Sequence, residues 1–166
     1  MASEPEQTSV EDIRKFSIIQ LVITAMFLGV VFWMFDGTNA DYPPIWLIVF
    51  LMVAIAVGAF LSERVWLTGT PLDPADGAAH NTERALSRFA SQTVRKLVYT
   101  EIPLLLAVLS CFVFDYGGWP VLIAGIPGLA VQAWETWPHL RNTSMAAAIF
   151  DSQGAESGLV ESFTHR

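Results

Sequence analysis

Four long apolar stretches dominate this 166-residue chain and restrict what it can fold into. They cover residues 16–35, 45–61, 98–114 and 119–134. The first is about twenty residues long and, as a helix, crosses the roughly 30 Å of bilayer hydrocarbon. We therefore expect an all-α, polytopic membrane protein whose four transmembrane helices form two hairpins. A cleaved signal peptide is the alternative for the first stretch, but its apolar region would end after about 15 residues.

The basic residues all fall on one side of the membrane that these stretches predict. They precede the first stretch, fill the connection between the second and third, or follow the fourth: Arg14, Lys15, Arg64, Arg84, Arg88, Arg95, Lys96, Arg141 and Arg166. The other two connections, 36–44 and 115–119, contain no Lys or Arg. Because basic loops stay on the cytoplasmic side, we expect both termini to be cytoplasmic in a plasma (inner) membrane protein.

Composition agrees with a membrane location and limits the partners. A hydrophobic content of 53% and a mean hydropathy of +0.46 are too high for an ordinary water-soluble domain. The net charge of −7 argues against nucleic acid as a partner. We therefore expect the lipid bilayer as one partner, and other membrane-protein subunits or a second copy of this chain as another.

The segments outside the four stretches are expected on the cytoplasmic side. Residues 1–15 read as an acidic tail that is helical near 10–15, and 139–166 as a second tail with one or two short helices, around 144–150 and 155–163. Residues 68–80 contain two prolines and two glycines and are expected to be irregular. Asp73 and Asp76 in this loop lack the further oxygen ligands of a calcium loop.

Residues 82–97 are predicted to form an amphipathic helix that continues into the third stretch. Its apolar stripe has helical spacing and consists of Leu86, Phe89, Ala90, Thr93, Val94 and Leu97. The basic residues of this segment, Arg84, Arg88, Arg95 and Lys96, take other positions. Such a stripe must be covered by lipid or by another part of the protein. We expect Leu86, Phe89 and Leu97 to dock on lipid or on the C-terminal tail.

Glu101 and Pro103 are the first candidate functional residues. Pro103 lacks the N–H that would bond to the Tyr99 carbonyl, so the helix should kink or start afresh there. The freed carbonyl and the Glu101 carboxylate are then expected close together, as in a cation or proton site. The alternative is structural: Glu101 lies only about 7 Å along the helix axis from Lys96 and pairs with Arg95 or another base at the interface.

Glu135 is the third candidate functional residue. It lies at the end of the fourth stretch, at nearly the depth of Glu101 on the third. The two carboxylates converge if these neighbouring helices pack through those faces. In the alternative, which we favour, Glu135 extends to water.

Signatures of catalysis are absent from the sequence. The three histidines, His80, His139 and His165, are scattered outside the four stretches, and no metalloprotease, nucleophile-elbow, P-loop or dinucleotide-binding motif occurs. A single cysteine, Cys111, excludes a disulfide framework or a thiolate metal site. We expect no enzyme activity, no catalytic residues, no cofactor and no metal.

Two short patterns and the tail carry a resemblance. They are Tyr99-Thr-Glu-Ile-Pro103, Trp134-Glu-Thr-Trp-Pro138 and the segment 150–158. Together they resemble small, functionally unassigned four-span plasma-membrane proteins of bacteria, in particular of actinobacteria. The resemblance implies a plasma-membrane location and carries no activity with it.

The functional expectation follows from how little of the chain lies outside the predicted membrane. A four-helix protein of this kind works by packing against something else, so we expect an accessory, assembly or scaffolding component of a membrane complex. The alternative is a small oligomeric channel or transporter that uses Glu101 as a protonatable or ion-interacting site.

Overall fold

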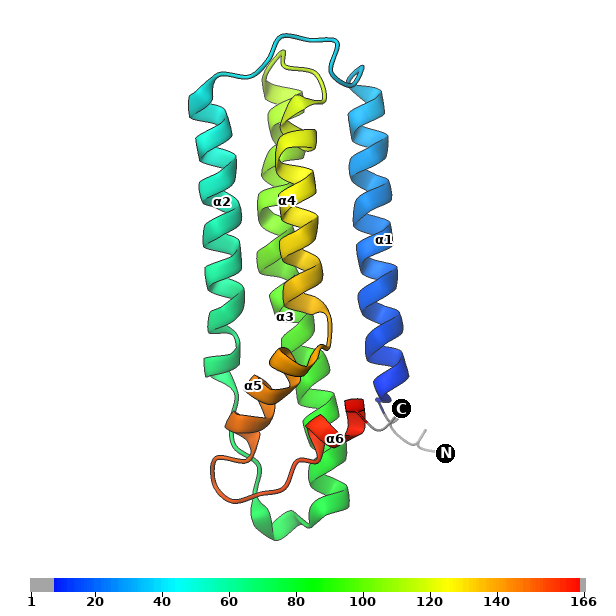
Figure 1. Cartoon of the computed structure of the whole chain (residues 1–166), viewed down its shortest axis with the longest axis vertical. Coiled ribbons are helices and arrows are strands. Elements are labelled where there is room, and N and C mark those ends of the chain that lie inside the picture. Colours follow the sequence, from blue (N-terminus) through cyan, green and yellow to red (C-terminus); the bar gives the residue numbers. More distant parts are fainter. Residues whose placement is uncertain (1–7, 165–166) are drawn as a thin grey trace, which may run out of the picture.

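Helices account for most of the computed structural model, which describes residues 8–164. In this part of the chain the helices and 3₁₀ turns are α1 (Val10–Met34), α2 (Ile45–Arg64), η1 (Trp66–Thr68), η2 (Pro74–Asp76), α3 (Ala78–Val113), α4 (Trp119–Thr136), α5 (Leu140–Phe150) and α6 (Leu159–Thr164). The predictions for residues 1–7, His165 and Arg166 lie outside the described residues. The four longest helices run side by side, and α5 and α6 gather at the end where α1 begins (Figure 1).

Three helical segments are long and apolar enough to cross a membrane. They are Val10–Met34, Ile45–Thr68 and Ala78–Val113, and they cover the first three predicted stretches to within one residue. The helix α4 runs alongside them (Figure 1) but is shorter, at 18 residues. It contains two prolines, Pro120 and Pro127, and the polar residues Gln132 and Glu135 near its end.

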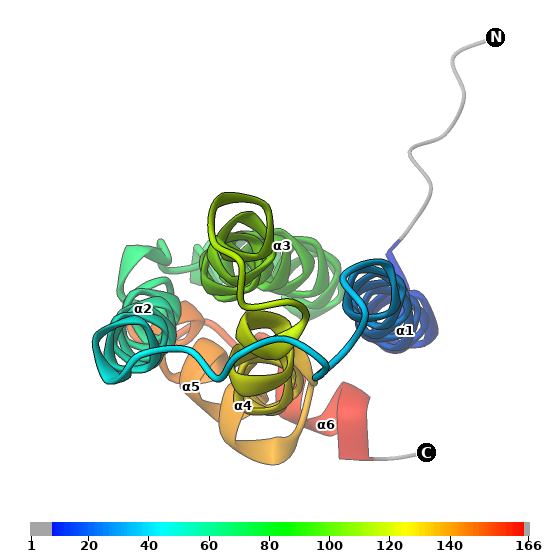
Figure 2. The same ribbon diagram turned by 90° about the horizontal axis from the view of Figure 1, so that it is seen from above.

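Among the four long helices, α4 lies between α1 and α2 and packs on α3 (Figure 2). One apolar cluster joins α1, α3 and α4 through Leu28, Val31, Leu104, Val108, Cys111 and Val121. A second joins α2, α3 and α4 through Leu47, Leu51, Ile55, Ala107 and Ala124. These two clusters close the interior over the half of the bundle farther from α5 and α6.

Large apolar side chains are exposed in a band around the bundle. On α1 they lie between Phe16 and Met34, and on α2 between Ile45 and Leu61. On α3 they are absent from the first four turns and then follow regularly: Val94, Val98, Tyr99, Ile102, Leu105, Leu109, Phe112 and Val113. A 20-residue helical segment such as 94–113 is about 30 Å long, which is the thickness of bilayer hydrocarbon. The exposed band therefore has the dimensions of a lipid-facing surface.

The amphipathic segment and the third stretch form one helix of 36 residues, as the sequence predicted. The helix does not start afresh at Pro103, which lies inside it. The prediction that 68–80 is irregular was wrong in part, because η1 and η2 are helical turns and α3 already begins at Ala78. Gly77, with φ of 80°, allows the sharp change of direction before that start.

The C-terminal tail covers the first half of α3. Phe89 is 1% exposed and lies between Trp66 and Phe163, at ring-centroid distances of 5.7 and 5.5 Å. Phe150 of α5 and Leu159 of α6 belong to the same apolar cluster. Of the two covers that the sequence allowed for Phe89, the tail is therefore the one observed. The two short tail helices were expected, but α5 begins earlier and α6 later than predicted.

Candidate functional site

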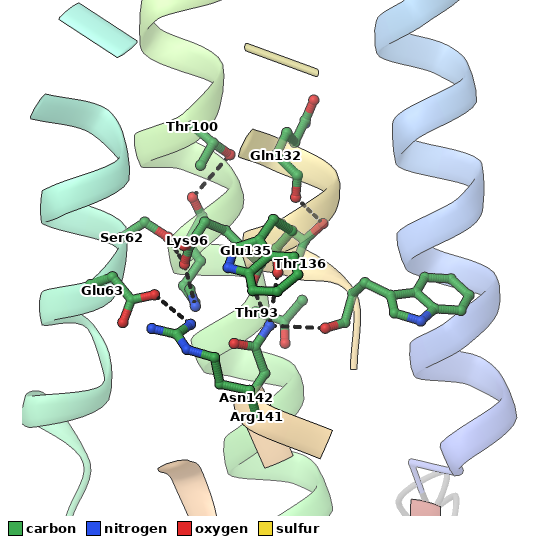
Figure 3. A network of polar contacts seen from close by, with 12 residues as sticks. Ser62, Glu63, Thr93, Lys96, Thr100, Gln132, Glu135, Thr136, Arg141 and Asn142 are labelled. Carbon is green, nitrogen blue, oxygen red and sulfur yellow. Dashed lines mark hydrogen bonds and ion pairs between the residues drawn. The ribbon is translucent and has the colours of Figure 1, made fainter. Parts of the chain in front are cut away.

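A buried ion pair joins α3 to α4 near the α5–α6 end of the bundle (Figure 3). The Nζ atom of Lys96 lies 2.6 Å from Oε2 of Glu135, and the two side chains are 0% and 5% exposed. Ser62 of α2 donates a hydrogen bond from Oγ to the same carboxylate oxygen over 3.2 Å. Burying two charges is costly unless they are paired, and here each charge has the other as its partner, while the carboxylate also accepts the Ser62 hydrogen bond.

The ring of Trp66 forms another wall of this site. The Lys96 Nζ atom lies 4.1 Å from the ring centroid, a distance at which the ring's π face attracts a cation. Trp66 is 1% exposed and stands in η1, directly after α2. The ring of Trp66 is thus enclosed between Lys96 and Phe89.

A second ion pair connects the site to the surface. Arg141 of α5 lies 2.8 Å from Glu63 of α2, and both side chains are partly exposed. The charge of Lys96 also acts on Glu63, and the Glu135 side chain lies close enough to interact with it. The hydrogen bond to Glu63 raises the pKa of Arg141 above its ordinary value, so the guanidinium stays charged. The path from the buried lysine to the surface arginine thus passes through two neighbouring carboxylates, Glu135 and Glu63.

The turn between α4 and α5 is fixed by Asn142. Its Nδ2 donates to the backbone carbonyls of Trp134, Glu135 and Trp137 over 3.1, 3.1 and 2.9 Å. Asn142 is 1% exposed, and these bonds satisfy carbonyls that the end of α4 leaves without helical partners. Asn142 therefore holds the end of α4, and with it Glu135, in place.

The helix α1 reaches the same level through Ser17. Its Oγ donates to the backbone carbonyl of Thr136 over 3.1 Å, and Ser17 is 1% exposed. We call the group that links all four long helices here the polar layer, made of Ser17, Ser62, Lys96, Glu135 and Thr136. Because apolar packing alone tolerates sliding between helices, directional contacts at one level fix their relative register. The polar layer can hold the bundle in a single arrangement.

Glu101 lies about one and a half turns beyond Lys96 on α3 and contacts α1. Gln20 donates to Glu101 Oε1 over 2.7 Å, and Thr24 donates to the same oxygen over 3.5 Å. The three side chains line a cavity of about 140 Å³ between the two helices. Ile23 and Leu105 also line this cavity. None of the ion pairs within residues 8–164 includes Glu101. Glu101 is thus a carboxylate at a lateral groove, bonded only to neutral donors.

The structure separates the three candidate residues that the sequence grouped. The Tyr99 carbonyl, which Pro103 leaves free, lies against Gly58 of α2, where an added Cβ would be 2.7 Å away. The Glu101 carboxylate is bonded to α1 instead, so the carbonyl and the carboxylate do not form the expected cation site. Glu101 and Glu135 likewise have different partners.

Two predictions about individual partners are corrected. Glu101 was expected, in its structural role, to pair with Arg95 or another base, and it accepts from Gln20 and Thr24. Glu135 was expected to extend to water, and it is 5% exposed and paired with Lys96. In both cases a neighbouring helix supplies the partner, and sequence spacing within one helix contains no information about that neighbour.

Sequence reasoning missed Lys96, Ser62 and Trp66 as members of the site. Lys96 was assigned to the polar face of α3, yet it is buried. It lies seven residues after Phe89 and three after Thr93, so the spacing used for the apolar stripe includes it. The spacing therefore indicated an inward position for Lys96, but we assigned it to the polar face because its side chain is charged.

No protein-family model, curated protein or solved structure matches this chain. The resemblance to four-span plasma-membrane proteins of actinobacteria therefore remains a prediction.

Proposed function

We propose that this chain is a four-span helical protein of the plasma membrane, with both termini cytoplasmic, that acts as an accessory subunit of a membrane complex. Its partner-binding surface is the groove between α1 and α3 that contains Glu101. The polar layer holds the four helices in register and so keeps this groove in shape.

The position of α4 supports a fourth span. It runs alongside three helices that are long and apolar enough to cross a membrane, and it packs against all three (Figures 1 and 2). Its inward side is closed by apolar clusters, with Val121 in one and Ala124 in the other. A helix enclosed by lipid-exposed neighbours needs less hydrophobicity of its own, because few of its side chains meet lipid.

The distribution of charge supports the orientation. Within residues 8–164 the basic side chains all belong to the α5–α6 end: they lie in the first turns of α1, in the last turn of α2, in the first half of α3 and in α5. The connections at the other end contain acidic residues, such as Asp36 and Asp115, and no Lys or Arg. This asymmetry is typical of a cytoplasmic α5–α6 end.

The observation that carries the accessory function is the environment of Glu101. A carboxylate beside a membrane-facing groove is costly unless it is protonated or neutralised by a donor. Gln20 and Thr24 supply neutral donors to one oxygen only. A partner transmembrane helix with a Lys, Arg or amide side chain at this depth would complete the site, and its apolar residues would fit between Ile23 and Leu105.

Cross-linking tests this proposal directly. A photo-reactive residue at Ile23, which lines the groove and is 54% exposed, should cross-link to a larger membrane subunit in native membranes. The same residue at Val53 on α2, which is 55% exposed, is the matched control and should not give this product. Purification in a mild detergent should recover the cross-linked subunit in stoichiometric amount.

The outcomes of this experiment separate the candidates. Loss of the Ile23 product in a Glu101→Gln background would support recognition through the carboxylate. Equal products from Ile23 and Val53 would contradict a groove-specific partner.

The second candidate function is a small oligomeric channel or transporter. It is favoured by the same carboxylate, which Gln20 and Thr24 hold beside a cavity within the span. A homo-oligomer purified without other subunits would favour it. In that case Glu101→Gln should abolish transport in vesicles while the protein accumulates normally, because glutamine retains the size and hydrogen bonding of the side chain but cannot bind a proton or ion.

A further inference from the structure

A polar pocket of about 240 Å³ lies on the α5–α6 side of the polar layer. Its walls come from α3, from the loop after η1 and from the end of α5, and its polar lining consists of Thr68, Thr70, Arg88, Ser91, Gln92 and Arg95. Among residues 8–164, no acidic side chain lines it. The cavities beside α1 differ, since their linings are largely apolar. This pocket therefore offers positive charge and hydrogen-bonding groups together.

The two arginines belong to one face of α3 and are two turns apart, about 10 Å along the helix axis. Arg88 is anchored, because its Nη1 donates to the carbonyls of Thr70 and Pro71 over 2.7 and 3.1 Å. Arg95 takes part in none of the ion pairs within residues 8–164. A guanidinium group offers several N–H donors in a planar fork that suits a phosphate, and both retain donors for one.

Gln92 lies between the arginines along the helix and is only 6% exposed. Its Oε1 has no hydrogen-bond partner among the described residues. A buried carbonyl oxygen without a partner is unfavourable, and a hydroxyl group of a bound molecule would satisfy it. The lining thus matches a ligand that combines a phosphate with a hydroxyl.

The level of the pocket in the molecule selects the source of that phosphate. Val94 is the first large apolar residue exposed on α3, and Leu67 beside the pocket is 68% exposed. Thr68 ends the second candidate span. The pocket therefore lies where the apolar band ends, which is the level of lipid headgroups.

We propose that this pocket binds the headgroup of an anionic glycerophospholipid, with the phosphate between Arg88 and Arg95 and a headgroup hydroxyl donating to Gln92. Phosphatidylglycerol has this chemistry. Basic pockets at the cytoplasmic ends of spans favour such headgroups. The inference rests on the membrane location proposed above, but not on the accessory role.

Lipid titration of the purified protein in a neutral detergent, read out by native mass spectrometry, tests the inference. Phosphatidylglycerol should bind with clear preference over phosphatidylcholine. Arg95→Gln should weaken this binding about fivefold or more, which is the contribution of one basic residue near a membrane surface. Arg84→Gln is the matched control, because Arg84 belongs to the same helix, lies outside the pocket and pairs with Asp76.

The proposed contact between Gln92 and the headgroup hydroxyl is tested separately. Gln92→Met should weaken binding of phosphatidylglycerol more than binding of phosphatidic acid, which has a phosphate but no hydroxylated headgroup. Equal loss for the two lipids would overturn the assignment of the hydroxyl.

Three results would overturn the proposal as a whole. The first is equal binding of phosphatidylglycerol and phosphatidylcholine, and the second is equal weakening of lipid binding by Arg84→Gln and Arg95→Gln. The third is displacement of the lipid by millimolar inorganic phosphate in an Arg95-dependent manner, because this would assign the pocket to soluble phosphate. Carbonate extraction of native membranes tests the membrane location independently of the lipid-binding proposal. A protein that resists extraction yet lacks lipid preference contradicts only this inference.

Discussion

Single residues decide how charge is tolerated inside this bundle. In place of water, Lys96 and Glu135 contact one another. Glu135 also accepts from the Ser62 hydroxyl, and Lys96 lies over the ring of Trp66. Removing one member of a buried pair leaves the other charge without compensation, which costs about 3–5 kcal/mol. We therefore expect Lys96→Met to lower the thermal unfolding temperature of the detergent-solubilised protein strongly.

The double variant Lys96→Met with Glu135→Leu should recover most of this loss, because it removes both buried charges. Arg141→Gln, which breaks the partly exposed pair with Glu63, is the control and should cost about 1 kcal/mol or less. A single Lys96→Met variant as stable as the wild type would show that the ion pair contributes nothing to the fold.

Gly58 offers a second test at the residue scale. A Cβ there would lie 2.7 Å from the Tyr99 carbonyl oxygen, which belongs to the backbone of α3 and cannot move aside cheaply. Gly58→Ala should therefore separate α2 from α3 and cost about 1–3 kcal/mol, the range for overpacking. Gly29→Ala on α1 meets nothing within 4 Å and should be neutral or slightly stabilising in the same thermal assay. Equal effects of the two substitutions would contradict the close approach.

At the scale of elements, α3 connects two environments in one helix. Its first half is covered by the tail through Phe89, and its second half exposes apolar residues from Val94 onward. The sequence predicted both halves and their continuity, because the apolar stripe and the uninterrupted third stretch are local patterns. It did not predict that Lys96 faces inward, since only the nearby Glu135 of α4 makes that position favourable.

Phe89→Asp should detach α5 and α6 from α3, because it places a carboxylate between Trp66 and Phe163. We expect a loss of about 3–5 kcal/mol, as for large truncations in a core, and rapid tryptic cleavage at Arg141. Leu86→Asp is the control, because Leu86 is only partly buried and should respond more weakly. Tail cleavage no faster than in the wild type would contradict the tail as the cover of α3.

At the scale of the whole molecule, the proposed topology is open to a labelling experiment. Cys111 is the only cysteine and is buried, so a Cys111→Ser background allows single cysteines at exposed positions. In intact cells an impermeant maleimide should label Thr38→Cys and Asp115→Cys. Ser152→Cys, in the loop after α5, should react only after permeabilisation.

The Ser152 result bears on α4 in particular. If only α1, α2 and α3 crossed the membrane, Ser152 would lie on the same side as Asp115 and would react in intact cells.

Several features follow from the sequence alone, namely the helical class, three apolar spans, the short connections between helices and the collection of basic residues in segments that meet at one end. They depend on hydrophobicity, charge and turn residues, which act over a few neighbouring positions. The partners of Glu101 and Glu135, the enclosure of Trp66 and the close approach of Gly58 to Tyr99 came only from the tertiary structure. Each of these joins residues on different helices, and the rotation of one helix against another is set by packing that no local pattern records.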